Sequence, residues 1–236
     1  MKPSPQAQSR FRAAVEHLAS IDDDLAAIVR AHGIPTVWLR PAGFASLALF
    51  ILEQQVSLAS ASTTYSRILA RIGRMTPEAL LATTADELRI AGVSRQKNRY
   101  LRALATAVID GSLDLSALPG LPDDEVRRQL EALPGIGRWT SDVYLLACLD
   151  HPDVWPVGDR ALQIAVGESL GLEAPPARDE LEAIGERWRP HRSAAARLLW
   201  HAYLDRRGRV ETPVTVLGPL DAEPTDPVAA EPTTGS

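Results

Sequence analysis

The chain of 236 residues is 45% hydrophobic and carries a formal net charge of −5, and its single cysteine, Cys148, excludes an internal disulfide and a multi-cysteine zinc or iron–sulfur site. No apolar run approaches the roughly 20 residues that cross a bilayer, and the first residues lack the apolar segment of a signal peptide. The length suits one large domain or two small lobes that share a core. We therefore expect a soluble, cytoplasmic protein.

The charge is unevenly distributed along the chain. Residues 211–236 hold five acidic residues, five prolines and no Lys or Arg, so the rest of the chain has equal numbers of acidic and basic residues. A neutral domain can still present one basic face to nucleic acid. The last segment cannot bury enough apolar area to offset the entropy of ordering. We predict one domain over residues 1–210 and a disordered, acidic, proline-rich tail over residues 211–236.

Apolar periodicity and capping residues predict helices along the whole domain and no strands. The stretch 44–57 is apolar nearly all round, which indicates a helix buried on most sides. Thr84 and Glu87 form a capping box, and Ser94 is a predicted N-cap. The predicted helices cover residues 9–19, 22–32, 44–57, a span after Ser57 to near Gly73, two short helices within 76–92, then 94–111, 121–133, a helix from near Arg138, and finally 160–170, 178–187 and 191–206.

The turn Leu133-Pro134-Gly135-Ile136-Gly137 lies between two of these helices and predicts a helix–hairpin–helix. Glycines at 135 and 137 allow positive φ and leave backbone N–H groups uncovered. With the start of the next helix at Arg138, these groups suit a phosphate. Ile136 is expected to fill the groove between the helices. The alternative for this motif alone is an ordinary tight connection.

Asp159 follows Gly158 at the start of a predicted helix, where the positive end of the helix dipole favours the ionised carboxylate. The alternative for this residue alone is a plain helix N-cap.

Taken together, the hairpin and "VWPVGD", with Asp159 20 positions after Trp139, resemble the helix-hairpin-helix superfamily of DNA glycosylases, which excise damaged bases. The resemblance covers about residues 12–206 and implies an all-α fold of two helical lobes, with the active site in the cleft between them. Three further stretches support it: "FILEQQVSLASASTTYSRI", "AGVSRQKNRYLRALATAVIDGSLDL", and "WRPHRSAAARLLWHAYL", which is similar to the 3-methyladenine DNA glycosylase II branch.

The resemblance implies roles for particular residues. Asp159 matches the catalytic aspartate, which stabilises an oxocarbenium-like sugar or activates water; both roles stay open. Trp139, Tyr144 and Trp200 are expected to line the base pocket, and Gln55 is expected to be the wedge that fills the vacated stack. Core packing is the alternative for the tryptophans, and a plain surface position is the alternative for Gln55.

The related branch that cleaves the strand uses a lysine nucleophile, and its position is Trp139 here. The chain's two lysines, Lys2 and Lys97, lie outside the segment from the hairpin to Asp159. The resemblance therefore implies a monofunctional hydrolase of alkylated purines, acting as a monomer on double-stranded DNA with a damaged base. It implies no iron–sulfur cluster and no other cofactor, with a monovalent cation at the hairpin left open. The alternatives are a glycosylase for another lesion and a catalytically silent DNA-binding module.

One departure from the family pattern concerns Glu53, which stands where the family usually has glycine. A carboxylate near DNA repels phosphate. We therefore expect either a different helix end at this point or an inward-pointing Glu53.

Overall fold

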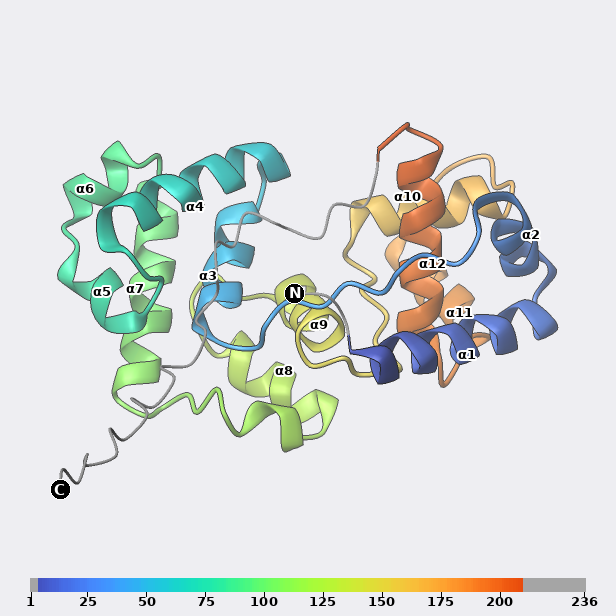
Figure 1. Ribbon diagram of the computed structural model, residues 1–236, viewed down its shortest axis with the longest axis horizontal. Helices are drawn as coiled ribbons and strands as arrows, with labels where there is room; N and C mark the ends of the chain where they lie inside the picture. The colour runs from blue at the N-terminus through green and yellow to red at the C-terminus, as the bar shows by residue number, and fades with distance from the viewer. Residues whose placement is uncertain (1–3, 210–236) are drawn as a thin grey trace, which may run out of the picture.

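The computed structural model describes residues 4–209, and within that range it consists of α-helices, one short 3-10 helix and connecting loops, without strands (Figure 1). The predicted all-α class is therefore confirmed. The predicted tail, residues 211–236, lies outside the described residues. The helices are α1 (Pro5–Ile21), α2 (Asp23–His32), α3 (Phe44–Glu53), α4 (Leu58–Ile72), α5 (Pro77–Ala82), α6 (Ala85–Ile90), α7 (Arg95–Ile109), α8 (Asp123–Glu131), α9 (Arg138–Ala147), α10 (Arg160–Ser169), α11 (Arg178–Glu186) and α12 (Arg192–Asp205), and the 3-10 helix is Leu118–Gly120.

The helices form two lobes, as predicted (Figure 1). In one lobe α3 packs against α4, α7 and α9, while α5 and α6 pack against α7. In the other lobe α12 packs against α1, α2 and α10. The chain therefore begins in the second lobe, crosses to the first after α2, and returns after α9. None of the helices within residues 4–209 is long and apolar enough to cross a membrane.

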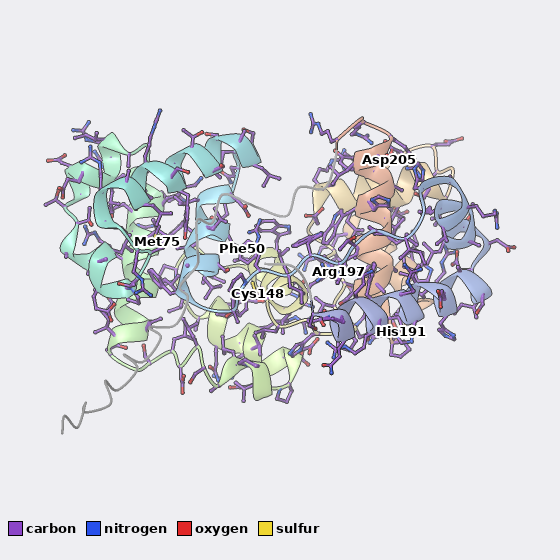
Figure 2. All side chains as sticks on the ribbon, viewed as in Figure 1. Phe50, Met75, Cys148, His191, Arg197 and Asp205 are labelled. Atoms are coloured by element: carbon purple, nitrogen blue, oxygen red, sulfur yellow. The ribbon has the colours of Figure 1, made fainter. Side chains whose placement is uncertain are left out.

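Arg197 joins the lobes. It lies on α12, is nearly fully buried, and donates to the carbonyls of Trp38 and Leu146 at 2.7 Å each; Figure 2 labels it near the middle of the molecule. The backbone N–H of Arg40 donates to the carbonyl of Ala147 at 2.8 Å. The crossing segment and the end of α9 are thus fixed to each other and to α12.

Helix α3 is buried on nearly all sides, as its apolar sequence predicts. It ends at Glu53, however, and the prediction of a helix through residue 57 is wrong. Gln55 has a left-handed backbone with φ of +58°, and Ser57 already caps α4 by accepting the Ser60 N–H. At the end of α3, Lys97 Nζ donates to the Leu52 carbonyl at 2.6 Å, which satisfies one of the carbonyls that a helix end leaves unpaired.

The loop before α10 is anchored to the second lobe. Trp155 is buried, packs edge-on against Trp188 with ring centroids 5.2 Å apart, and donates to the Leu181 carbonyl at 2.8 Å. The Val154 N–H donates to Ser193 Oγ at 2.9 Å. These contacts fix the loop that presents Asp159 at the start of α10.

Candidate active site

A cavity of about 880 Å³ lies between the lobes. One wall comes from the first lobe and its hairpin, and the other comes from the loop and first turn that open α10. Its lining comprises residues 53–55, Gln96, Tyr100, residues 135–137, Trp139, Thr140 and residues 158–161.

Asp159 lies in this cavity with both carboxylate oxygens engaged. Oδ1 accepts the Leu162 N–H at 2.8 Å and Trp200 Nε1–H at 3.1 Å, and Oδ2 accepts Trp139 Nε1–H at 2.8 Å. Asp159 is therefore the N-cap of α10 and a cavity residue at once. A carboxylate offers about four acceptor positions, so about one is left to face the cavity.

The two predicted pocket tryptophans meet at this carboxylate but occupy different places. Trp139 is half-buried and lines the cavity. Trp200 lies on α12, is buried, and is not among the cavity-lining residues; its indole reaches Asp159 on the other oxygen. The pocket role of both residues stays a prediction, with Trp139 as the ring in contact with the cavity.

Tyr144 does not line the cavity, which corrects its predicted role. It is fully buried, its hydroxyl accepts the Gly43 N–H at 2.9 Å, and burial raises the pKa of its phenol. Tyr144 lies five positions after Trp139, which places it about 140° further round the helix. Because of this rotation, Tyr144 lies on the side of α9 that faces the core, whereas Trp139 lies on the side that faces the cavity.

The two hairpin glycines differ. Gly135 has φ of +87°, and a Cβ there would lie 2.2 Å from the ring of Tyr100. Gly137 has φ of −112° and ψ of −178°, so the expected positive φ at this residue is wrong. It needs no left-handed backbone because it already serves as the extended N-cap of α9. As a glycine it gives α9 no side-chain cap, so the first N–H groups of the helix keep no side-chain partner.

Ile136 is buried and also borders the cavity, and its place in the groove between the hairpin helices stays a prediction. Arg138 is 44% exposed, and its Nε donates to Asp142 Oδ2 at 2.9 Å. Asp142 is fully buried and also accepts from Arg127 Nε at 2.8 Å. The guanidinium of Arg138 is thus oriented at the start of α9, and its contact with phosphate stays a prediction.

The segment before α4 carries the predicted wedge. Gln55 is exposed and lines the cavity. Gln54 Nε2 donates to the Gly135 carbonyl at 2.8 Å, which ties this segment to the hairpin. Glu53 is buried in a bidentate pair with Arg40, at 2.9 and 3.0 Å. The inward-pointing alternative for Glu53 is therefore confirmed, and its charge is paired with the Arg40 guanidinium.

Among the cavity-lining residues to which the sequence analysis gave no role are Gln96, Tyr100 and Arg160. Gln96 and Tyr100 are four positions apart on α7, and Gln96 Nε2 donates to Tyr100 Oη at 2.6 Å. The i, i+4 spacing was a visible signal for their shared face. Arg160 directly follows Asp159. Within residues 4–209, no group of His, Cys, Asp and Glu side chains is arranged to hold a metal ion.

Comparison with known proteins identifies the family of the chain. Residues 48–190 match the HhH-GPD superfamily of base excision DNA repair proteins, and the chain belongs to this superfamily. Among its relatives is the putative DNA-3-methyladenine glycosylase YfjP of Bacillus subtilis, 29% identical over 160 residues, which are 64% of this chain. The matched region spans 56% of YfjP.

Two solved structures share the fold. The 3-methyladenine DNA glycosylase Mag1 of Schizosaccharomyces pombe, in complex with abasic DNA, superposes with a TM-score of 0.73 at 25% identity, covering 80% of this chain and 95% of that one. A DNA-3-methyladenine glycosidase from Bacillus halodurans gives a TM-score of 0.72 at 31% identity, covering 83% of this chain and 91% of that one.

Proposed function

We propose that the protein is a monofunctional DNA glycosylase that flips alkylated purines out of double-stranded DNA and excises them by hydrolysis. The observation that carries the proposal is the carboxylate of Asp159, held at the wall of a cavity of about 880 Å³ by the indole N–H of Trp139. The relatives named above as 3-methyladenine glycosylases support the choice of alkylated purines.

The reaction breaks the bond between the purine nitrogen and C1′ of the sugar. As the bond breaks, the base leaves with the electron pair and positive charge builds on the sugar. The fixed carboxylate of Asp159 stabilises that charge or accepts a proton from the attacking water, and the proposal includes both roles. Water adds its oxygen to C1′, and the products are the free base and an abasic site.

Selection of the base follows from charge. An alkylated purine carries positive charge, so the electron-rich ring of Trp139 attracts it more strongly than a normal base. The purine must leave the stack to reach this ring, and the side chain of Gln55 occupies the space it vacates. The hairpin residues Gly135 to Arg138 hold the phosphate backbone without reading bases. The protein acts as a monomer and uses no cofactor.

The test is base release from methylated duplex DNA, with free 3-methyladenine and 7-methylguanine measured by chromatography. Wild-type protein is expected to release alkylated purines and to leave abasic sites that hot alkali cleaves. Release of a mismatched or deaminated base in place of alkylated purines would assign another lesion. Binding to damaged duplex without any base release would identify a catalytically silent module.

A further inference from the structure

Arg197 is a charged side chain buried where the two lobes meet. It lies on α12 in the second lobe, is 3% exposed, and is labelled in Figure 2 between α12 and α9. A buried charge is costly, and an apolar side chain of similar volume packs without that cost. What an arginine adds is a rigid fork of donors, which fixes both a distance and a direction. The contacts of this fork therefore show what the charge is placed to hold.

The fork of Arg197 binds the first lobe through backbone carbonyls. Its two terminal nitrogens donate to the carbonyls of Trp38 and Leu146 at 2.7 Å each, and its guanidinium carbon lies 4.9 Å from the centroid of the Trp38 ring. Leu146 is one residue before the end of α9. Its carbonyl is therefore among the four that a helix end leaves unpaired, and it belongs to the negative end of the helix dipole. The cation thus completes the end of α9 from the other lobe.

The same two helices are joined a second time at Asp159. Trp139, in the first turn of α9, donates to Asp159 Oδ2 at 2.8 Å, and Trp200, on α12, donates to Oδ1 at 3.1 Å. Trp139 precedes Leu146 by seven residues, which is about 10 Å along the helix axis. Trp200 follows Arg197 by three residues, which is nearly one helical turn. Two helices joined at two separate levels keep a defined separation and angle.

The bonds at these two levels differ in whether they cross between the lobes. Helix α10 packs against α12, so Asp159 and Trp200 both belong to the second lobe and move with it. The bond from Trp139 to Asp159 crosses from the first lobe to the second, and so does the bond between Arg197 and Leu146. The contact between Trp139 and Asp159 in the candidate active site therefore depends on how the far end of α9 is held against α12.

We propose that Arg197 is a positioning residue for base excision: by joining α12 to the end of α9, it sets where the indole of Trp139 meets the carboxylate of Asp159. The inference rests on the proposed role of Asp159 in that reaction. Arg197 is not among the residues that line the cavity, so it acts through Trp139. The Arg40 N–H still binds the Ala147 carbonyl when the fork is removed. Loss of the fork is therefore expected to shift α9 and not to separate the lobes.

The first test measures how fast the indole N–H groups of the free protein exchange with water, by NMR. In Arg197→Met, and to a smaller extent in Arg197→Lys, the Trp139 N–H is expected to exchange about tenfold faster than in wild type. The lysine variant keeps the charge without the fork, so it gives the test if the methionine variant does not fold. The indole N–H groups of Trp155, Trp188 and Trp200 are bonded within the second lobe and are expected to keep their rates.

Arg192 provides the matched control. It lies on the same helix, its side chain is 12% exposed, and it donates to the Asp153 carboxylate at 2.9 Å and to the Asp153 carbonyl at 2.8 Å, within the second lobe. Arg192→Met is expected to lower the free energy of unfolding and to leave the Trp139 exchange rate unchanged. An unchanged Trp139 rate in the Arg197 variants would overturn the proposal. Equal acceleration of all four indoles, or the same Trp139 acceleration in Arg192→Met, would also overturn it, because either result indicates a general loss of stability.

The second test is a double-variant cycle on single-turnover base release. Arg197→Lys is expected to slow release about fivefold in the wild-type background and less than about twofold in the Trp139→Phe background. The reason is that a residue acting through the Trp139 N–H has nothing to position once that N–H is removed. Equal factors in the two backgrounds would overturn the proposal. The NMR readout needs no DNA, so a wild-type protein that releases no base would refute the proposed function, while the exchange rates would still decide whether Arg197 positions Trp139.

Discussion

Trp139 Nε1 donates to Asp159 Oδ2 at 2.8 Å, across 20 positions of sequence and from a different helix. The aromatic ring predicted to hold the damaged base and the carboxylate predicted to act on its sugar are therefore fixed in one geometry before DNA binds. Groups that are positioned in advance need no reorganisation during the reaction. This preorganisation is a main source of electrostatic stabilisation of a transition state.

Trp139→Phe tests this link. The variant keeps an aromatic ring and removes the N–H that orients the carboxylate. Base release under single-turnover conditions is expected to fall about tenfold or more, while affinity for an abasic duplex stays within about threefold. Trp200→Phe is the matched variant. Its rate of base release is expected to fall less, since Asp159 Oδ1 still accepts the Leu162 N–H. Full activity in Trp139→Phe would show that the hydrogen bond does not position Asp159.

Alanine is expected to affect the free energy of unfolding very differently at the two hairpin glycines. Gly135→Ala places a Cβ 2.2 Å from the Tyr100 ring at a left-handed backbone position, so it is expected to lower the free energy of unfolding by about 2 kcal/mol or more. Gly137→Ala meets no atom within 4 Å at φ of −112°, so it is expected to lose only the preference for glycine at the N-cap, about 1 kcal/mol or less. Urea unfolding measures both. Equal stability of the two variants would contradict the hairpin geometry.

A bulkier change at Gly137 tests the phosphate contact itself. Gly137→Val leaves the fold intact but covers the N–H groups at the start of α9, so it is expected to weaken binding to all DNA sequences alike. Gel-shift assays on duplexes of unrelated sequence measure this. Loss of affinity for one sequence alone would indicate base reading by the hairpin.

Because Arg40 and Glu53 form a buried ion pair, the effects of substituting them on the free energy of unfolding are expected to be strongly coupled. Glu53→Gln leaves the Arg40 guanidinium without its charged partner in the core and is expected to destabilise the protein by about 3 kcal/mol. The double variant Arg40→Met, Glu53→Met removes both charges and is expected to recover most of that loss. Urea unfolding of Arg40→Met, Glu53→Met and the double variant gives the interaction free energy. Additive losses would contradict the pairing.

Strand cleavage is expected to be absent. Lyase chemistry needs an amine at C1′, and the position that supplies it in the related branch is Trp139 here. Lys97 is engaged by the Leu52 carbonyl and is not among the cavity-lining residues. Borohydride trapping with an abasic duplex is expected to give no covalent adduct. An adduct that persists in Lys2→Ala and is lost in Lys97→Ala would place Lys97 in the active site.

Local signals in the sequence were sufficient for the helices and for the position of Asp159. The N-cap at Ser94 and the capping box at Thr84 are set by residues three positions apart, and the structure has them as predicted. The family resemblance, carried by the hairpin and its spacing to Asp159, brought Trp139 and Trp200 into the candidate site.

The end of α3 could not be predicted from local signals, because it depends on contacts between distant segments. The end of α3 at Glu53 is set by Arg40 and Lys97, which lie 13 and 45 positions from the residues they bind. The error at Tyr144 is of another kind, since the spacing of five residues from Trp139 already places it on another side of α9. The requirement for glycine at 135, in contrast, depends on a tyrosine from α7. Periodicity alone does not fix such contacts.

The most direct test of the account is single-turnover base release by Asp159→Asn on a duplex with one alkylated purine. Asparagine can still cap α10, but its amide nitrogen cannot accept an indole N–H, so the variant removes the charge and one hydrogen bond while it keeps the shape. Base release is expected to fall by about a hundredfold or more, with affinity for an abasic duplex within about tenfold of wild type. Release within about threefold of wild type would contradict the catalytic role of Asp159 and leave it as a helix cap.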